Sequence, residues 1–177
     1  MKRRTLLQGF AGAAAMSMLS GCSRAADPIA AAAAAADPAV VRLDRPDSFW
    51  RGKLSPAEFE VLFEAGTERS GSSPLNGEKR AGTFICAACY LPLFLSKWKF
   101  ESGTGWPSFT QSIAGHMATS TDYKMILPRT EYHCARCGGH QGHIFDDGPP
   151  PLGVRWCNNG VALNFVQQGQ PLPALRG

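Results

Sequence analysis

The chain has 177 residues, of which 44% are hydrophobic and 18% charged, with six cysteines and a formal net charge of +4. This length leaves room for one domain and a targeting segment. Lys2, Arg3 and Arg4 account for +3 of the +4, so the chain from Cys22 onward carries +1, and its nearly neutral body argues against a nucleic-acid partner.

The N-terminus has the pattern of an export signal. Residues 1–4 are basic, and residues 5–21 carry no charge and are rich in Ala, Leu, Met and Gly. This run is too short for a membrane-spanning helix, which needs roughly 20 strongly apolar residues. Arg3-Arg4-Thr5-Leu6-Leu7 is similar to a twin-arginine signal. We therefore expect residues 1–21 to direct export to the periplasm.

Leu19-Ser20-Gly21-Cys22 resembles a bacterial lipobox, in which the cysteine is lipidated and becomes the first residue of the mature chain. The alternative is cleavage after Ala25, with loss of Cys22. Residues 22–43 are rich in alanine and have no amphipathic face, so we expect a tether that joins a lipid anchor at Cys22 to the folded body. The domain is expected at residues 44–170 and a C-terminal tail at 171–177.

Residues 54–63 predict one short helix. Ser55 suits the N-cap, Pro56 suits the first helical position, and Glu58 completes a capping box. Gly66 can end the helix. The apolar positions with the i, i+3, i+4 spacing of a buried stripe are Phe59, Leu62 and Phe63.

From Thr83 onward, short β-branched or aromatic runs alternate with Gly- and Pro-rich turns, which is typical of β-strands. Strands are predicted at 83–86, 124–127, 143–145, 154–157 and 161–166. Residues 147–151 contain three consecutive prolines and cannot continue a central strand. The predicted fold is therefore mainly β, a small domain of antiparallel sheets with a short N-terminal helix.

Two C-x-x-C pairs, Cys86 with Cys89 and Cys134 with Cys137, have the spacing of a structural tetrathiolate site. Zinc prefers this ligand set, so we predict one structural Zn²⁺ per chain that joins two loops. Gly138 allows a tight turn after the second pair, whereas the first pair has no such glycine. Two alternatives remain open: a disulfide within each pair, or a thioredoxin-like redox centre, for which the sequence offers no βαβ context.

Cys157 is left without a partner, which makes it a candidate nucleophile. Arg155 and Asn159 would share its face of a strand, and a guanidinium beside a thiol favours the thiolate. His140 and His143 lie upstream, and imidazole can transfer protons near neutral pH.

An aromatic residue and a second apolar ring complete the candidate site. Trp106 lies on a loop fixed by glycines and a proline, and Phe145 follows His143 at strand spacing. Each residue also has a plainer interpretation. Cys157 could be a small buried hydrophobe, the histidines further metal ligands, and Trp106 part of the core.

Residues 54–166 resemble the methionine-R-sulfoxide reductases, the MsrB family. The matching segments are Gly66-Thr67-Glu68-Arg69, 103–109 (Gly-Thr-Gly-Trp-Pro-Ser-Phe), 129–131 (Arg-Thr-Glu), 134–138 (Cys-Ala-Arg-Cys-Gly), 142–145 (Gly-His-Ile-Phe), 147–151 (Asp-Gly-Pro-Pro-Pro) and 155–157 (Arg-Trp-Cys).

The resemblance implies that the chain reduces methionine-R-sulfoxide in oxidised proteins. Cys157 would attack the sulfoxide sulfur and become a sulfenic acid while methionine leaves. Trp106 would pack on the substrate methyl group and Phe145 would help to line the methyl pocket. His140 and His143 would polarise and protonate the sulfoxide oxygen.

The resemblance also implies that Asn159 orients this network, that Arg155 favours the thiolate, and that the two cysteine pairs hold zinc in a small β domain. Many relatives carry a resolving cysteine where this chain has Thr104, so we expect an external, thioredoxin-like thiol reductant. Asn158 and Gly160 replace the usual Ile and Ser beside the nucleophile. We expect a monomer. The alternative functions are a non-catalytic zinc-ribbon-like interaction module and a thiol–disulfide oxidoreductase.

Overall fold

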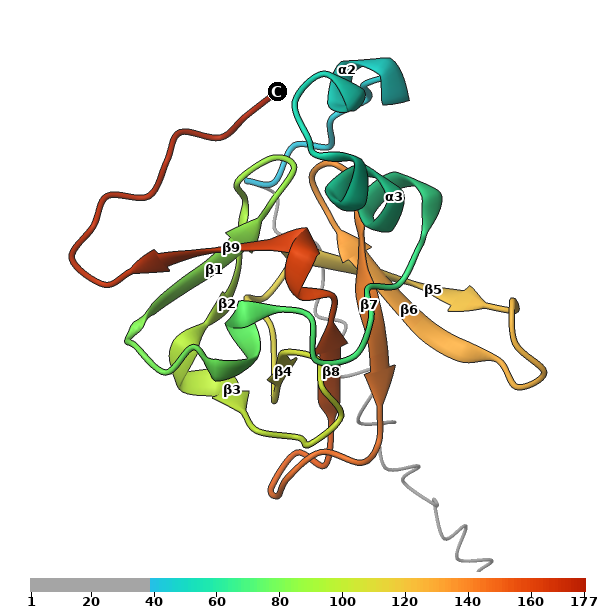
Figure 1. Ribbon diagram of the computed structural model, residues 1–177, viewed down its shortest axis with the longest axis vertical. Helices are drawn as coiled ribbons and strands as arrows, with labels where there is room; N and C mark the ends of the chain where they lie inside the picture. The colour runs from blue at the N-terminus through green and yellow to red at the C-terminus, as the bar shows by residue number, and fades with distance from the viewer. Residues whose placement is uncertain (1–38) are drawn as a thin grey trace, which may run out of the picture.

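Two antiparallel β-sheets form the body of the protein in a computed structural model that describes residues 39–177 (Figure 1). The expected export signal, the lipobox at Cys22 and most of the tether lie outside the described residues. The smaller sheet has the order β2-β1-β9 and the larger β3-β4-β8-β7-β6-β5. The strands are β1 Gly82–Cys86, β2 Pro92–Leu95, β3 Lys99–Phe100, β4 Ser108–Phe109, β5 Met117–Asp122, β6 Arg129–Cys134, β7 His140–Phe145, β8 Arg155–Asn158 and β9 Leu163–Gln167. The predicted fold class is confirmed.

Helical structure is short and lies mostly before the sheets. The helices are α2 Asp47–Arg51 and α3 Pro56–Glu64, with 3-10 turns η1 Pro74–Gly77, η2 Ser96–Trp98 and η3 Gly160–Ala162. The predicted capping box is present, because Ser55 Oγ accepts from Glu58 N and the Glu58 carboxylate accepts from Ser55 N at 2.7 Å. α3 ends on Ala65 in the left-handed conformation (φ 50°) rather than on Gly66. None of the helices in residues 39–177 is long and apolar enough to cross a membrane.

The strand predicted at residues 124–127 is wrong. These residues form the loop between β5 and β6, where Ile126 is fully exposed and Met125 is 60% exposed. The run has β-forming composition but no neighbouring strand to pair with. In contrast, β5 and β6 are rich in polar residues and were not predicted, because their pairing with each other and with β7 stabilises them.

Aromatic side chains join the two sheets. Phe94 of β2 stacks on Phe109 of β4 with ring centroids 4.0 Å apart, and Phe84 of β1 meets Phe109 edge-on at 5.0 Å. Tyr132 and Trp156 extend this cluster through β6 and β8 at 4.8 Å. Because Trp156 is buried in this core, the next residue on β8 points to the opposite face of the sheet.

Candidate active site and metal centre

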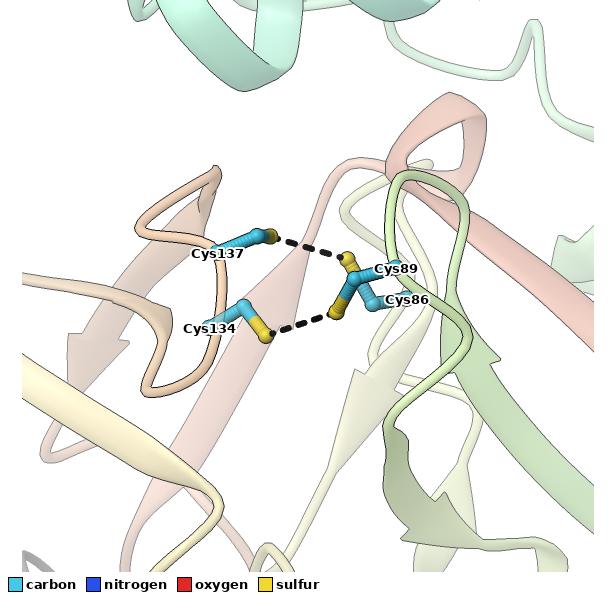
Figure 2. Close-up of side chains that lie close together, drawn as sticks. All are labelled: Cys86, Cys89, Cys134 and Cys137. Atoms are coloured by element: carbon cyan, nitrogen blue, oxygen red, sulfur yellow. Dashed lines mark hydrogen bonds between the residues drawn. The ribbon is translucent and has the colours of Figure 1, made fainter. Parts of the chain in front are cut away.

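The four paired cysteines converge between two loops, one after β1 and one after β6. Figure 2 shows the loops facing each other with the thiol groups turned into the space between them. The Sγ atoms of Cys86 and Cys137 are 3.7 Å apart, those of Cys89 and Cys134 are 3.6 Å apart, and all four lie within 4.8 Å of one another. A tetrahedron of Zn–S bonds of about 2.3 Å places its sulfurs about 3.8 Å apart, so these residues fit a structural zinc ion.

The surroundings of the thiols disfavour both redox alternatives. The cysteines of both pairs are at most 7% exposed, which prevents exchange with a partner's thiol. All four cysteines carry free thiols, so neither pair is joined in a disulfide. Burial raises the pKa of the Cys86 and Cys134 thiols, so thiolates at this place need a cation to stabilise them.

The first loop replaces the missing glycine with a tyrosine. Tyr90, directly after Cys89, has φ 64°, and Gly138, directly after Cys137, has φ 77°. A left-handed conformation costs a residue with a Cβ roughly 1–2 kcal/mol. The guanidinium of Arg176 lies over the Tyr90 ring, 4.4 Å from its centroid, and helps to hold this strained position.

The end of the segment expected as a tail, residues 171–177, lies against both cysteine loops through Arg176. Arg176 donates through its backbone N–H to Cys89 O at 3.0 Å and through its guanidinium to Ala88 O and Ala87 O, each at 2.5 Å. Arg136, between the cysteines of the second loop, donates to Arg176 O at 2.7 Å. This segment therefore ties the two halves of the metal centre together.

A separate cavity of about 230 Å³ surrounds Cys157. Its lining residues are Thr67, Trp106, Arg129, Gly142, His143, Phe145, Cys157, Asn158 and Asn159. His143 of β7 lies directly opposite Cys157 of β8 in the sheet. A Cβ on Gly142 would lie 1.9 Å from the Cys157 carbonyl oxygen, so only glycine lets β7 approach β8 this closely.

Arg155 lies beside the cavity rather than in its lining. It makes a bidentate pair with Asp147, with Nε–Oδ1 and Nη2–Oδ2 distances of 2.7 and 2.9 Å. The guanidinium also lies 4.4 Å from the centroid of the Phe145 ring. Burial raises the pKa of the Cys157 thiol, and the positive charge and hydrogen bond of Arg155 oppose that shift.

Asp122 fixes the orientation of His143. Its carboxylate accepts from His143 Nε2 at 2.8 Å, from Arg129 Nη2 at 2.7 Å and from the Lys124 amide at 2.8 Å. The Lys124 amide and then His143 hold the pKa of Asp122 well below its usual range. Burial lowers the pKa of His143, and Asp122 opposes this. At neutral pH the imidazole is therefore mainly neutral.

His140 does not line the cavity. It is buried, its Nδ1 donates to Glu131 Oε1 at 2.6 Å, and its ring centroid lies 5.4 Å from that of His143. Burial raises the pKa of Glu131, but the hydrogen bonds from His140 and Ser120 and the nearby histidine charges together outweigh it and leave the pKa below its usual value. The two predicted histidines are therefore neighbours: His143 lines the cavity, and His140 lies behind it.

Glu68 connects three parts of the site. Its backbone carbonyl accepts from Trp106 Nε1 at 3.1 Å, and its backbone N–H donates to Asn159 Oδ1 at 3.1 Å. Its carboxylate accepts from the amides of Gly160 and Val161. Glu68 therefore fixes the indole and the chain that follows the nucleophile in one arrangement.

Thr104, at the position where many relatives have a resolving cysteine, contacts the nucleophile. Its side chain opposes the rise that burial causes in the pKa of the Cys157 thiol. Within the described residues, the position beside Cys157 that could hold a second thiol therefore holds the hydroxyl group of Thr104.

Asn158 lies at the end of a buried polar chain. Its Oδ1 accepts from Tyr132 Oη at 2.8 Å, and its Nδ2 donates to Gln141 Oε1 at 3.2 Å. Gln141 in turn donates to Cys86 Sγ at 3.5 Å. All of these side chains are inaccessible to solvent, so the polar Asn158 in place of the family's isoleucine is fully satisfied.

Gly160, which replaces the family's usual serine, packs closely against Ser73. The place of a Cβ at this position lies 1.9 Å from Ser73 Oγ. A serine at 160 would require Ser73 to move.

Several site residues were not predicted from the sequence: Thr67, Glu68, Asp122, Arg129, Glu131, Gln141 and Asp147. Glu68, Arg129, Glu131 and Asp147 lie within segments that match the MsrB pattern, and a charged residue inside such a segment was an available signal. Nothing in the local sequence distinguishes Asp122 or Gln141, which reach the site only through strand pairing.

One family model and several known proteins are similar to this chain. A family model for the SelR domain matches residues 54–167, which include both cysteine loops and the cavity around Cys157. The peptide methionine sulfoxide reductase MsrB of Pseudomonas putida is 46% identical over 125 residues, which cover 70% of this chain and 94% of the relative. The enzyme of the same name from Bradyrhizobium diazoefficiens is 49% identical over 117 residues, covering 66% and 84% of the two chains. That from Agrobacterium fabrum is 43% identical over 125 residues, covering 70% and 93%.

Proposed function

The chain belongs to the SelR-domain family of MsrB methionine sulfoxide reductases, and from this membership we propose how its residues act on the substrate. The protein is an oxidoreductase that returns methionine-R-sulfoxide in oxidised proteins to methionine. One observation carries the assignment of roles. The Cys157 thiol shares a cavity with Trp106 and His143, whereas the other four cysteines of residues 39–177 are buried at the metal centre.

Cys157 attacks the sulfoxide sulfur as a thiolate. The sulfur–oxygen bond breaks, the oxygen passes to Cys157 and takes up a proton, and the products are a cysteine sulfenic acid and methionine. Two external thiols then reduce the sulfenic acid to the thiol and form one disulfide and one water molecule. We assign the reductant to a thioredoxin-like protein, because Thr104 cannot act as a resolving residue.

The cavity walls give the substrate its orientation. Trp106 and Phe145 enclose the methyl group, and His143 meets the sulfoxide oxygen. His140 acts indirectly, through its contact with His143, and Asn159 holds the end of the nucleophile's strand. Because a sulfoxide is pyramidal, an aromatic wall on one side and the His143 imidazole on the other select one epimer.

The zinc site contributes to folding and not to the reaction. Cys86, Cys89, Cys134 and Cys137 would hold the ion with no open position, so it cannot bind substrate.

We also propose a location for the enzyme from residues outside the described range. A twin-arginine signal at residues 1–21 would export the folded, metal-loaded chain, and a lipid at Cys22 would anchor it on the periplasmic side of a membrane. The net charge of only +1 from Cys22 onward argues against a nucleic-acid partner.

Replacing Cys157 with Ser tests the assigned nucleophile. We expect reduction of the R epimer to fall below detection, while the zinc content and the unfolding temperature stay as in the wild type, because the residue lies outside the metal centre. The measurement is an epimer-resolved sulfoxide assay with metal analysis of the same sample. Full activity in this variant, or wild-type activity on the S epimer alone, would overturn the proposal.

A further inference from the structure

A groove adjoins the cavity around Cys157. It lies between α3, the η1 segment and the start of β9, and its volume of about 730 Å³ is within the roughly 300–1,000 Å³ of ligand-binding clefts. Figure 1 shows α3 next to the short turn that leads from β8 into β9. Thr67 lines both spaces, and Gly160 and Val161, which line the groove, directly follow Asn159 of the cavity. The groove and the cavity therefore adjoin each other at Thr67.

One wall of the groove is the free edge of β9. Ala162 O accepts from Ala87 N and Gln168 N donates to Ala81 O, and both pairs follow the β1–β9 register. Hydrogen-bonded pairs alternate in an antiparallel ladder. The backbone N–H and C=O groups of even-numbered residues of β9 therefore point toward β1, and those of odd-numbered residues point away from it. No strand of the described chain pairs with this outer side.

The free backbone groups along this edge lie in the groove. The Leu163 N–H already donates to Gly160 O, which leaves Leu163 O together with the N–H and C=O of Phe165 unpaired toward the groove within residues 39–177. Unpaired N–H and C=O groups on a strand edge are a template for an added strand.

The walls combine apolar surface with negative charge. Val61, Leu75 and Val161 line the apolar part, and no lysine or arginine is among the residues that line the groove. The Glu68 carboxylate is engaged by backbone amides, whereas Glu60 is exposed on α3. The groove thus suits an extended chain with apolar side chains and a basic residue facing Glu60.

We propose that this groove binds the polypeptide segment beside the methionine sulfoxide, extended along the free edge of β9, and that Glu60 favours a lysine or arginine in that segment. This inference rests on the proposed function. The cavity of about 230 Å³ takes the oxidised side chain, and the larger groove takes the backbone that carries it.

The test compares a small substrate with a peptide on the full, metal-loaded chain. The small substrate is N-acetyl-methionine-R-sulfoxide methylamide, and the peptide has methionine-R-sulfoxide at its centre and a lysine nearby. Asn164 is exposed and lines the groove, so Asn164→Trp obstructs the groove. Gln168→Trp, on an exposed residue outside the groove, is the matched control.

We expect Asn164→Trp to raise KM for the peptide about tenfold, equivalent to about 1.4 kcal/mol, and to leave kcat/KM for the small substrate unchanged. Gln168→Trp should change neither. Glu60→Lys should remove the preference for the lysine-containing peptide over one with glutamate there. When the peptide bonds of the substrate are N-methylated one at a time, the methyl group at every second position should raise KM, as pairing with a strand edge requires.

Other outcomes would overturn the inference. Equal effects of Asn164→Trp on both substrates, or a peptide KM no lower than that of the small substrate, would show that the groove does not bind the chain. A wild-type dimer that Asn164→Trp converts to a monomer would assign the groove to a second copy. A wild-type enzyme that reduces neither substrate would instead refute the proposed function.

Discussion

Cys157 lies half-buried between groups with opposite effects on its reactivity. Burial disfavours the thiolate, while Arg155 and Thr104 favour it. Arg155 is itself fixed by two hydrogen bonds to Asp147 and by the Phe145 ring, so its charge stays next to the thiol. The reactivity of Cys157 therefore depends on the charges that surround its sulfur atom.

Arg155→Met should shift the rising limb of the pH–rate profile to higher pH. Removing the guanidinium removes an interaction that lowers the pKa of Cys157, so the thiolate fraction at neutral pH falls. The rate of alkylation of Cys157 by iodoacetamide, measured against pH, reports this titration directly. Arg155→Lys keeps the positive charge and should shift less. An unchanged profile in Arg155→Met would exclude this role for the charge.

Asn158→Ile, which restores the residue usual in the family, should destabilise this chain by about 1–3 kcal/mol. It leaves the Tyr132 hydroxyl and the Gln141 Oε1 atom buried without a partner. Urea unfolding of the single variants and of the double variant with Tyr132→Phe measures the coupling. The double variant should recover part of the loss, since both members of one hydrogen bond are then apolar. A stable single variant would show that the polar chain adds nothing.

At the scale of elements, strand pairing and a docked tail build two sites on one scaffold. β7 contributes His143 to the cavity and Gln141 to the contact with Cys86, so residues two apart on a single strand reach the two sites. Residues 171–177 brace both cysteine loops through Arg176. The metal centre is therefore closed by a segment far from it in sequence.

Arg176→Gln should release zinc about tenfold faster, the rate equivalent of about 1.4 kcal/mol, because the first cysteine loop loses the charged hydrogen bonds that the guanidinium donates to Ala87 O and Ala88 O. Transfer of zinc to a colorimetric chelator measures the rate. Arg80→Gln removes an arginine from a surface pair with Glu78 and serves as the control. If both variants release the metal at the wild-type rate, the tail does not brace the centre.

The whole molecule is a small body in which metal and core stabilise the fold together. A tetrathiolate zinc site contributes about 10–16 kcal/mol in small domains, and the net stability of a domain is about 5–15 kcal/mol. These values are comparable, so the metal decides whether the two cysteine loops, and the sheets that carry them, stay folded.

Removing zinc with a strong chelator should therefore abolish the cooperative thermal transition. Circular dichroism followed by addition of excess zinc measures the loss and its reversal. Activity should disappear and return in step with the fold, since the ion lies in a closed site away from the cavity. A metal-free chain that keeps a cooperative transition would show that the core is sufficient without the ion.

The features that follow from local chemistry were predictable from the order of the amino acids. The capping box at Ser55 and Glu58 is a short-range hydrogen-bond pattern, and the two C-x-x-C pairs define a ligand set by residue type and spacing. Alternation of apolar runs and turns was enough to predict antiparallel sheets. The unpaired Cys157 with its neighbouring arginine pointed to the residue around which the cavity forms.

The features that depend on pairing between distant segments are seen only in the folded chain. The run at 124–127 has strand composition but no neighbour, whereas the polar β5 is a strand because β6 lies beside it. Asp122 reaches His143 across two strand pairings, and Arg176 reaches the cysteine loops from the end of the described chain. Such contacts arise when the backbone register brings side chains together, and register is a property of the assembled sheet rather than of any one segment.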